Sequence, residues 1–123
     1  MPLKFEIYRI IILLLGIGEG LTNLIYLISK RGVTLARNQH KEIPPTVTDK
    51  QMKLKIIMLF IFGIIFLICA LYSFITKTFP KTIISTVFVC FAVYAVIEAS
   101  YYRYWKTIGF AVLAISLAII LII

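Results

Sequence analysis

The chain has 123 residues, of which 62% are hydrophobic, and its mean hydropathy is +1.04. Soluble domains are only about 45–50% apolar, so this composition indicates an integral membrane protein. The formal charge of +8 comes from Lys and Arg residues that lie almost wholly between the apolar runs. There they indicate topology, and because they form no basic stripe interleaved with aromatic residues, we exclude nucleic-acid binding.

Four apolar runs predict an all-α protein, an integral membrane four-helix bundle that forms one domain over residues 1–123. A helix needs about 20 apolar residues to cross the hydrocarbon core. The expected spans are residues 10–29, 56–76, 82–100 and 107–123. The first run lacks the short hydrophobic region and small-residue cleavage site of a signal peptide, so we expect it to be an uncleaved span.

The first span carries an acidic residue near its middle. Glu19 and Asn23 fall on one helix face, and Gly16 and Gly20 form a small-xxx-small pair on the same side. One central charge costs about 3 kcal/mol, whereas the Leu and Ile residues of residues 10–29 together contribute about 4–7 kcal/mol, so the span still inserts. In one interpretation Glu19 and Asn23 hydrogen-bond to a closely packed helix. In the other, Glu19 binds and releases a proton in a water-accessible cavity and couples it to a cationic or polar cargo.

The long polar loop, residues 30–55, is strongly basic. We expect Gly32 to end the first helix and residues 33–40 to form a short interfacial helix. Thr48 and Gln51 have the spacing of a capping box, which predicts that the second helix begins in water.

The distribution of basic residues predicts the orientation. The first and third loops hold nine Lys and Arg residues, whereas the N-terminal lead and the second loop hold four. The positive-inside rule therefore places the loop of residues 30–55 in the cytoplasm and both termini outside.

We expect the basic residues of the two cytoplasmic loops to bind anionic lipid headgroups or a protein partner. They are Lys30, Arg31, Arg37, Lys41, Lys50, Lys53, Lys55, Arg103 and Lys106. His40 is the only histidine in the chain, and one histidine does not make a metal site. We therefore expect no metal and no cofactor.

The third span carries a polar face. Tyr94 and Glu98 are four residues apart and so lie one above the other on that face. Glu98 could pair with Arg103 or Lys106 near the headgroups. Alternatively, Tyr94 and Glu98 could join two residues of the first span in one intramembrane polar cluster. The four members of that cluster would be Glu19, Asn23, Tyr94 and Glu98.

The last span carries a stripe of small residues, Ala111, Ala114 and Ala118. Small side chains let membrane helices approach closely, so this stripe predicts a helix-packing face.

Glu19, followed by Thr22 in the first of four spans, resembles the central glutamate of the small multidrug resistance transporters, which work as dimers around that residue. The long loop of residues 30–55 departs from the short connections of that family. We therefore take the resemblance as an analogy of mechanism and do not assign the chain to the family.

These observations favour a small polytopic protein of a bacterial cytoplasmic membrane that acts as a binding, immunity or regulatory accessory factor. Its expected partners are anionic headgroups and either further copies of the chain or another membrane protein. The alternative is an oligomeric proton-coupled small-molecule transporter or channel that uses Glu19. Metal, redox and hydrolase signatures are missing, so we do not expect an enzyme. An intramembrane enzyme with Glu19 and Glu98 as acid and base would also need a substrate pocket.

Overall fold

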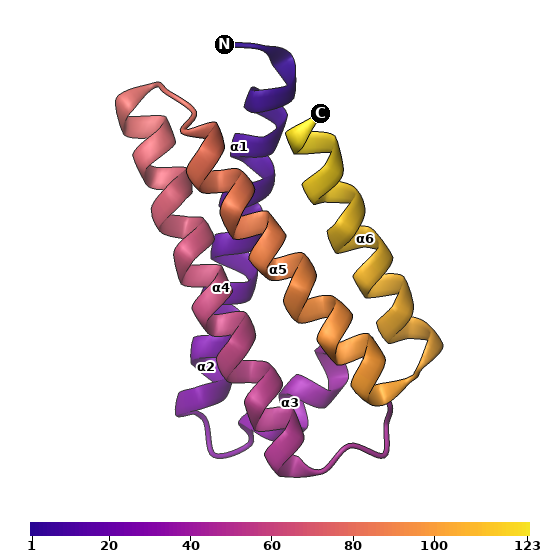
Figure 1. Cartoon of the computed structure of the whole chain (residues 1–123). Helices are drawn as coiled ribbons and strands as arrows, with labels where there is room; N and C mark the ends of the chain where they lie inside the picture. Colours follow the sequence, from indigo (N-terminus) through magenta and orange to yellow (C-terminus); the bar gives the residue numbers. More distant parts are fainter. The chain divides into compact units, whose positions relative to one another are not determined.

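The computed structural model describes all 123 residues and is all-α, with 83% of the residues in helices. In chain order the helices are α1 (Leu3–Leu15), the π-helical turn η1 (Gly16–Leu21), α2 (Thr22–Ile28), α3 (Gly32–Gln39), α4 (Asp49–Thr76), α5 (Lys81–Tyr102) and α6 (Trp105–Ile122) (Figure 1). The first three form one continuous helical stretch.

Four helical stretches are long and apolar enough to cross a membrane, as the sequence predicted. They are Leu3–Ile28, Asp49–Thr76, Lys81–Tyr102 and Trp105–Ile122. The first two begin seven residues before the expected spans, because each helix continues through its polar flank into the interfacial region. The chain is thus a small multi-pass membrane protein.

The contacts divide the chain into two units. Unit 1 consists of Met1–Gln39 and Thr48–Pro80, and unit 2 consists of His40–Val47 and Lys81–Ile123. The loop between α3 and α4 therefore belongs to unit 2, although the helices on both sides of it belong to unit 1.

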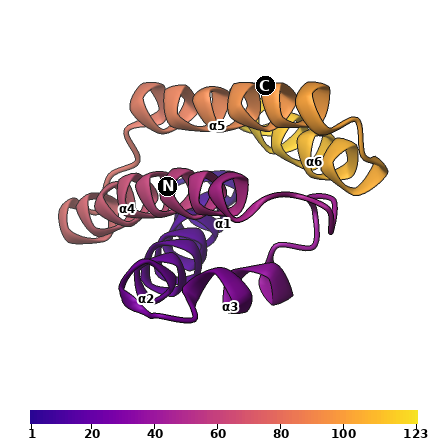
Figure 2. The same ribbon diagram turned by 90° about the horizontal axis from the view of Figure 1, so that it is seen from below.

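In unit 1 the first helical stretch packs along α4. Its buried residues recur on one face and include Tyr8, Ile12 and Asn23. At one end of this pair the Phe5 and Phe79 rings stack, with their centroids 4.7 Å apart. At the other end, α3 lies beside α2 and the start of α4 (Figure 2).

The start of α4 confirms the predicted capping box. The Thr48 hydroxyl accepts a hydrogen bond from the Gln51 amide at 3.2 Å, and the Gln51 side chain accepts one from the Thr48 amide at 2.9 Å. The expected short helix is also present as α3. These local signals therefore define the ends of the polar loop.

The prediction that Gly32 ends the first helix is wrong. That helix ends at Ile28, since Ser29 takes an extended conformation, and Gly32 is the first residue of α3. A Cβ atom at Gly32 would collide with the carbonyl of Tyr26. Glycine is needed here for the close turn between α2 and α3.

In unit 2, α5 and α6 pack against each other, and the Phe91 and Phe110 rings meet edge to face with centroids 5.5 Å apart. Arg103, with φ of 50°, turns the chain between the two helices. The loop of residues His40–Val47 is attached to this pair, because the Thr107 hydroxyl donates a hydrogen bond to the carbonyl of Glu42.

Candidate functional site

A close contact between the first helical stretch and α4 lies at the middle of the first span. A Cβ atom built on Gly63 of α4 would lie 2.3 Å from the backbone nitrogen of Gly20 and 2.6 Å from its Cα. A Cβ atom on Gly16 would likewise lie 2.6 Å from the Cα of Leu67. The predicted glycine pair of the first span thus faces α4, and the two backbones touch at this point.

Gly63 was missed in the sequence, although a signal was present. It is the only glycine of the second span. An isolated glycine inside a helical pattern costs about 1 kcal/mol relative to alanine, and close packing against a neighbouring helix is one reason for that cost. The sequence did not show that this reason was Gly20.

Glu19 and Asn23 lie next to this contact and hydrogen-bond to each other within one helical stretch. The Asn23 amide nitrogen donates to the Glu19 carboxylate at 3.0 Å and to the Glu19 backbone carbonyl at 2.6 Å. Asn23 is fully buried and Glu19 is half-buried. Because η1 is a π-helical turn, the regular hydrogen-bond ladder changes at Glu19, and the Asn23 side chain caps the carbonyl there.

Tyr94 and Glu98 form a second hydrogen-bonded pair, in unit 2. The Tyr94 hydroxyl lies 2.6 Å from the Glu98 carboxylate, and Glu98 is buried. Each pair is formed within its own helix and its own unit. The prediction that the four residues make one cluster stays a prediction.

The small residues of the last span are buried. Ala111, Ala114 and Ala118 are each at most 5% exposed. Ala118 also lines an apolar groove between α5 and α6, opposite Ala92 and Val96. The stripe therefore lies on a packed face of α6.

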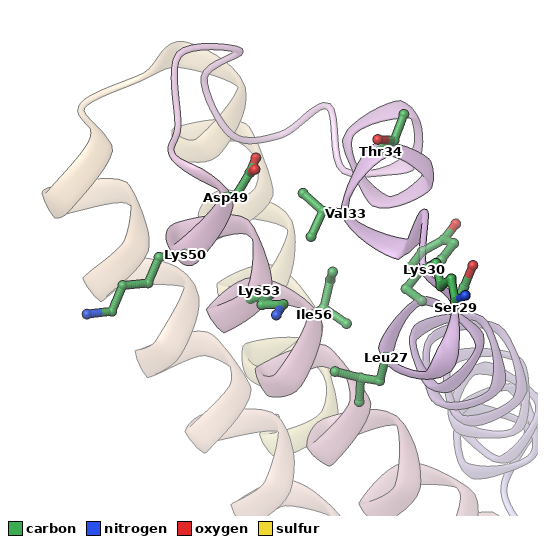
Figure 3. A pocket seen from close by; sticks show the side chains of 10 residues that line it. Leu27, Ser29, Lys30, Val33, Thr34, Asp49, Lys50, Lys53 and Ile56 are labelled. Atoms are coloured by element: carbon green, nitrogen blue, oxygen red, sulfur yellow. The ribbon is translucent and has the colours of Figure 1, made fainter.

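A basic pocket lies in unit 1 where α2, α3 and α4 meet, and its volume is about 730 Å³ (Figure 3). We call it the α2–α4 pocket. Its lining residues are Tyr26, Leu27, Ser29, Lys30, Val33, Thr34, Asp49, Lys50, Lys53 and Ile56. It brings together three of the lysines that were expected to bind headgroups or a partner.

The remaining basic residues of the polar loop differ in their surroundings. Arg37 forms an ion pair with Asp49, with 2.8 Å between Nη2 and Oδ1. Arg31 and Lys41 are exposed, whereas Lys55 is only 2% exposed. Sequence alone did not separate the buried lysine from its exposed neighbours.

The two basic residues of the last loop lie at the turn between α5 and α6. Arg103 is exposed and forms the left-handed turn itself. The Lys106 ammonium lies 5.3 Å from the centroid of the Trp105 ring, a cation–π contact with its neighbour. Both residues therefore lie among the aromatic residues of this turn, Tyr101, Tyr102, Tyr104 and Trp105.

His40 is buried, and its Nδ1 atom lies 3.3 Å from the carboxylate of Glu42. No group of three or more potential metal-ligating side chains comes together in the structure.

Comparisons with protein-family models, curated proteins and solved structures gave no match to the chain.

Proposed function

We propose that this multi-pass protein is a binding, immunity or regulatory accessory factor of a bacterial cytoplasmic membrane and is not an enzyme. It recognises a membrane-protein partner, or another copy of itself, through helix faces and the basic loop of residues 30–55.

The observation that carries this proposal is that the basic loop is folded. Its charges lie on α3 and on the capped first turn of α4, and the ion pair between Arg37 and Asp49 joins these two helices. A segment that served only to orient the spans would need its charge but no fixed arrangement. A folded arrangement of charges favours selective recognition, because electrostatic complementarity fixes the register of a partner.

The surroundings of Glu19 also support binding over transport. Its carboxylate accepts a hydrogen bond from the fully buried Asn23, and the adjacent backbones of Gly20 and Gly63 are in contact. Glu19 thus lies beside a close backbone contact between two helices and is already hydrogen-bonded within its own helical stretch, which favours a structural role for it.

The proposed orientation places residues 30–55 in the cytoplasm and both termini outside. It follows from the positive-inside rule. Labelling of Lys41→Cys and Lys77→Cys variants with a membrane-impermeant maleimide tests it, and we expect only the Lys77→Cys protein to react from outside intact cells. Reaction of Lys41→Cys alone would reverse the orientation.

The binding function is tested by isolating cross-linked complexes from the native membrane. The variant Arg31→Gln/Lys41→Gln removes two exposed charges of the basic loop. Its matched control, Lys77→Gln/Lys81→Gln, removes two exposed charges from the opposite flank. We expect the loop variant to lose its partner, and the control and Glu19→Gln to keep it. A complex that survives in the loop variant but is lost in Glu19→Gln would contradict the proposal.

The second candidate function is an oligomeric proton-coupled transporter or channel. One observation favours it: Glu19 lies in a π-helical turn, and such turns are frequent at functional sites. Measurements of proton-driven uptake into proteoliposomes distinguish this transport function from the binding function.

A further inference from the structure

We propose that the α2–α4 pocket binds the phosphate headgroup of an anionic membrane lipid. The proposal needs no protein partner, so it can fail or succeed independently of the binding function above.

The α2–α4 pocket is positively charged. None of the ammonium groups of Lys30, Lys50 and Lys53 forms an ion pair or hydrogen bond within the structure. Asp49 is the only acidic residue of the lining, and its carboxylate already binds Arg37. The pocket therefore has three unpaired positive charges and no unpaired negative one.

The positions of these lysines divide them into two groups. Lys30 follows α2, and Lys53 extends from α4 on the side of Ile56 and Leu27 (Figure 3). Lys50 extends away from Leu27 and Lys30 (Figure 3). We therefore assign the main phosphate contacts to Lys30 and Lys53, and a peripheral role to Lys50.

Hydroxyl and amide donors add to the charge. Tyr26, Ser29 and Thr34 bring three hydroxyl groups to the lining. Val33 and Thr34 lie in the first turn of α3, where backbone amides lack intrahelical acceptors. Charge-assisted hydrogen bonds from lysines, combined with such donors, are the usual way of holding a phosphate group.

The apolar side chains indicate a lipid and not a soluble phosphate compound. Leu27, Val33 and Ile56 line the same pocket as the lysines. Ile28 and Leu54, which are neighbours of lining residues in the sequence, are exposed, at 76% and 59%. A lipid would place its phosphate among the lysines and its acyl chains along these apolar residues at the ends of two spans. The volume of about 730 Å³ lies within the range of about 300–1,000 Å³ that is usual for small-molecule sites.

The test uses the full-length protein, delipidated in neutral detergent and titrated with single lipids under native mass spectrometry. The probes are dioleoylphosphatidylglycerol and the zwitterionic dioleoylphosphatidylcholine. We expect the anionic lipid to bind at least tenfold more tightly. Equal binding of the two lipids would overturn the proposal.

The pocket variant is Lys30→Gln/Lys53→Gln, and its matched control is Lys77→Gln/Lys81→Gln, which removes the same charge elsewhere. We expect the pocket variant to lose at least fivefold in affinity for the anionic lipid, and the control to lose less than twofold. An equal loss in both variants would mean that lipid binding follows net charge alone. That result would overturn the assignment of the lipid site to this pocket.

A second substitution keeps the test valid if the double variant does not fold. Thr34→Asp adds a carboxylate to the lining in the first turn of α3, where acidic residues stabilise a helix. We expect it to weaken anionic lipid binding at least fivefold, while Asn38→Asp, on the same helix but outside the lining, has less than twofold effect. Identical lipid affinities in these two variants would refute the proposal that the pocket is the lipid site.

Inorganic phosphate, added at millimolar concentration, distinguishes the two sources of a phosphate group. We expect it to leave the bound lipid in place, because it cannot use the apolar part of the site. Displacement of the lipid at these concentrations would assign the pocket to a soluble phosphate ligand and overturn the lipid proposal.

Discussion

The two units of the molecule pack their helices in different ways. In unit 1 the first helical stretch and α4 meet backbone to backbone, with Gly20 against Gly63. In unit 2 the pair of α5 and α6 buries alanines and large rings, such as Ala114 and Phe91. Gly109 of α6 would have no atom within 4 Å of an added Cβ.

This difference shows where each unit tolerates change. A backbone contact cannot move aside, so one methyl group must push two helices apart. A contact made by side chains can adjust its rotamers, and the same added volume costs less. Unit 1 also contains Glu19 and the α2–α4 pocket, so the unit with the backbone contact holds both candidate sites.

The largest expected effect comes from Gly63→Ala. We expect it to lower the free energy of unfolding by about 3 kcal/mol, the upper end for overpacking, because the new Cβ has only the Gly20 backbone to displace. Equilibrium unfolding in mixed micelles measures it. The reciprocal Gly20→Ala should cost less, since its Cβ would lie 3.4 Å from the nearest atom.

Gly18→Ala is the matched control, because nothing lies within 4 Å of its added Cβ. We expect it to be neutral or to stabilise by up to about 1 kcal/mol, through helix propensity alone. A similar loss of stability in Gly18→Ala and Gly63→Ala would show that the loss in Gly63→Ala does not come from the backbone contact with Gly20.

The next effect belongs to unit 2. Ala114→Leu enlarges a side chain that is 1% exposed, and we expect a cost of about 2 kcal/mol. Val112→Leu, at a position 57% exposed, should change the unfolding free energy by less than about 0.5 kcal/mol. If Ala114→Leu lowered the free energy of unfolding more than Gly63→Ala does, unit 2 and not unit 1 would be the unit that tolerates added volume less.

Thr48→Ala should have a smaller effect, about 1 kcal/mol, the usual cost of losing a helix N-cap. Hydrogen exchange of the first turn of α4 reports this loss directly. We expect faster exchange at Gln51, whose amide loses its acceptor. Unchanged exchange there would show that the capping box does not hold the end of the helix.

The smallest effect is expected for Arg37→Gln. Its ion pair with Asp49 is exposed, with side-chain accessibilities of 30% and 80%, and exposed pairs contribute about 0–1 kcal/mol. We expect the melting temperature in detergent to fall by no more than a few degrees and the loss to shrink at high salt. A large, salt-independent loss would show that α3 depends on this pair.

Much of unit 1 could be predicted from the sequence, because its signals are local. The capping box of Thr48 and Gln51 and the shared face of Glu19 and Asn23 depend only on spacing along one helix. The number of spans likewise follows from the length of the apolar runs.

The contacts between helices could not be predicted. In a membrane both the packed and the lipid-facing sides of a helix are apolar. In α4, for example, Phe62 and Phe66 are buried while Ile61 and Ile65 are exposed. The apolar pattern therefore does not show which face meets a neighbour, and it identified neither Gly63 as the contact nor the assembly of Lys30 and Lys53 in one pocket.

In our proposal, Glu19 supports helix packing in a binding protein and does not drive transport. Proteoliposomes that contain wild-type protein or Glu19→Gln, with an imposed pH gradient and a panel of cationic compounds, test it most directly. We expect uptake into both to equal that of protein-free liposomes. Proton-driven uptake by the wild type that Glu19→Gln abolishes would contradict the claim and establish the transporter.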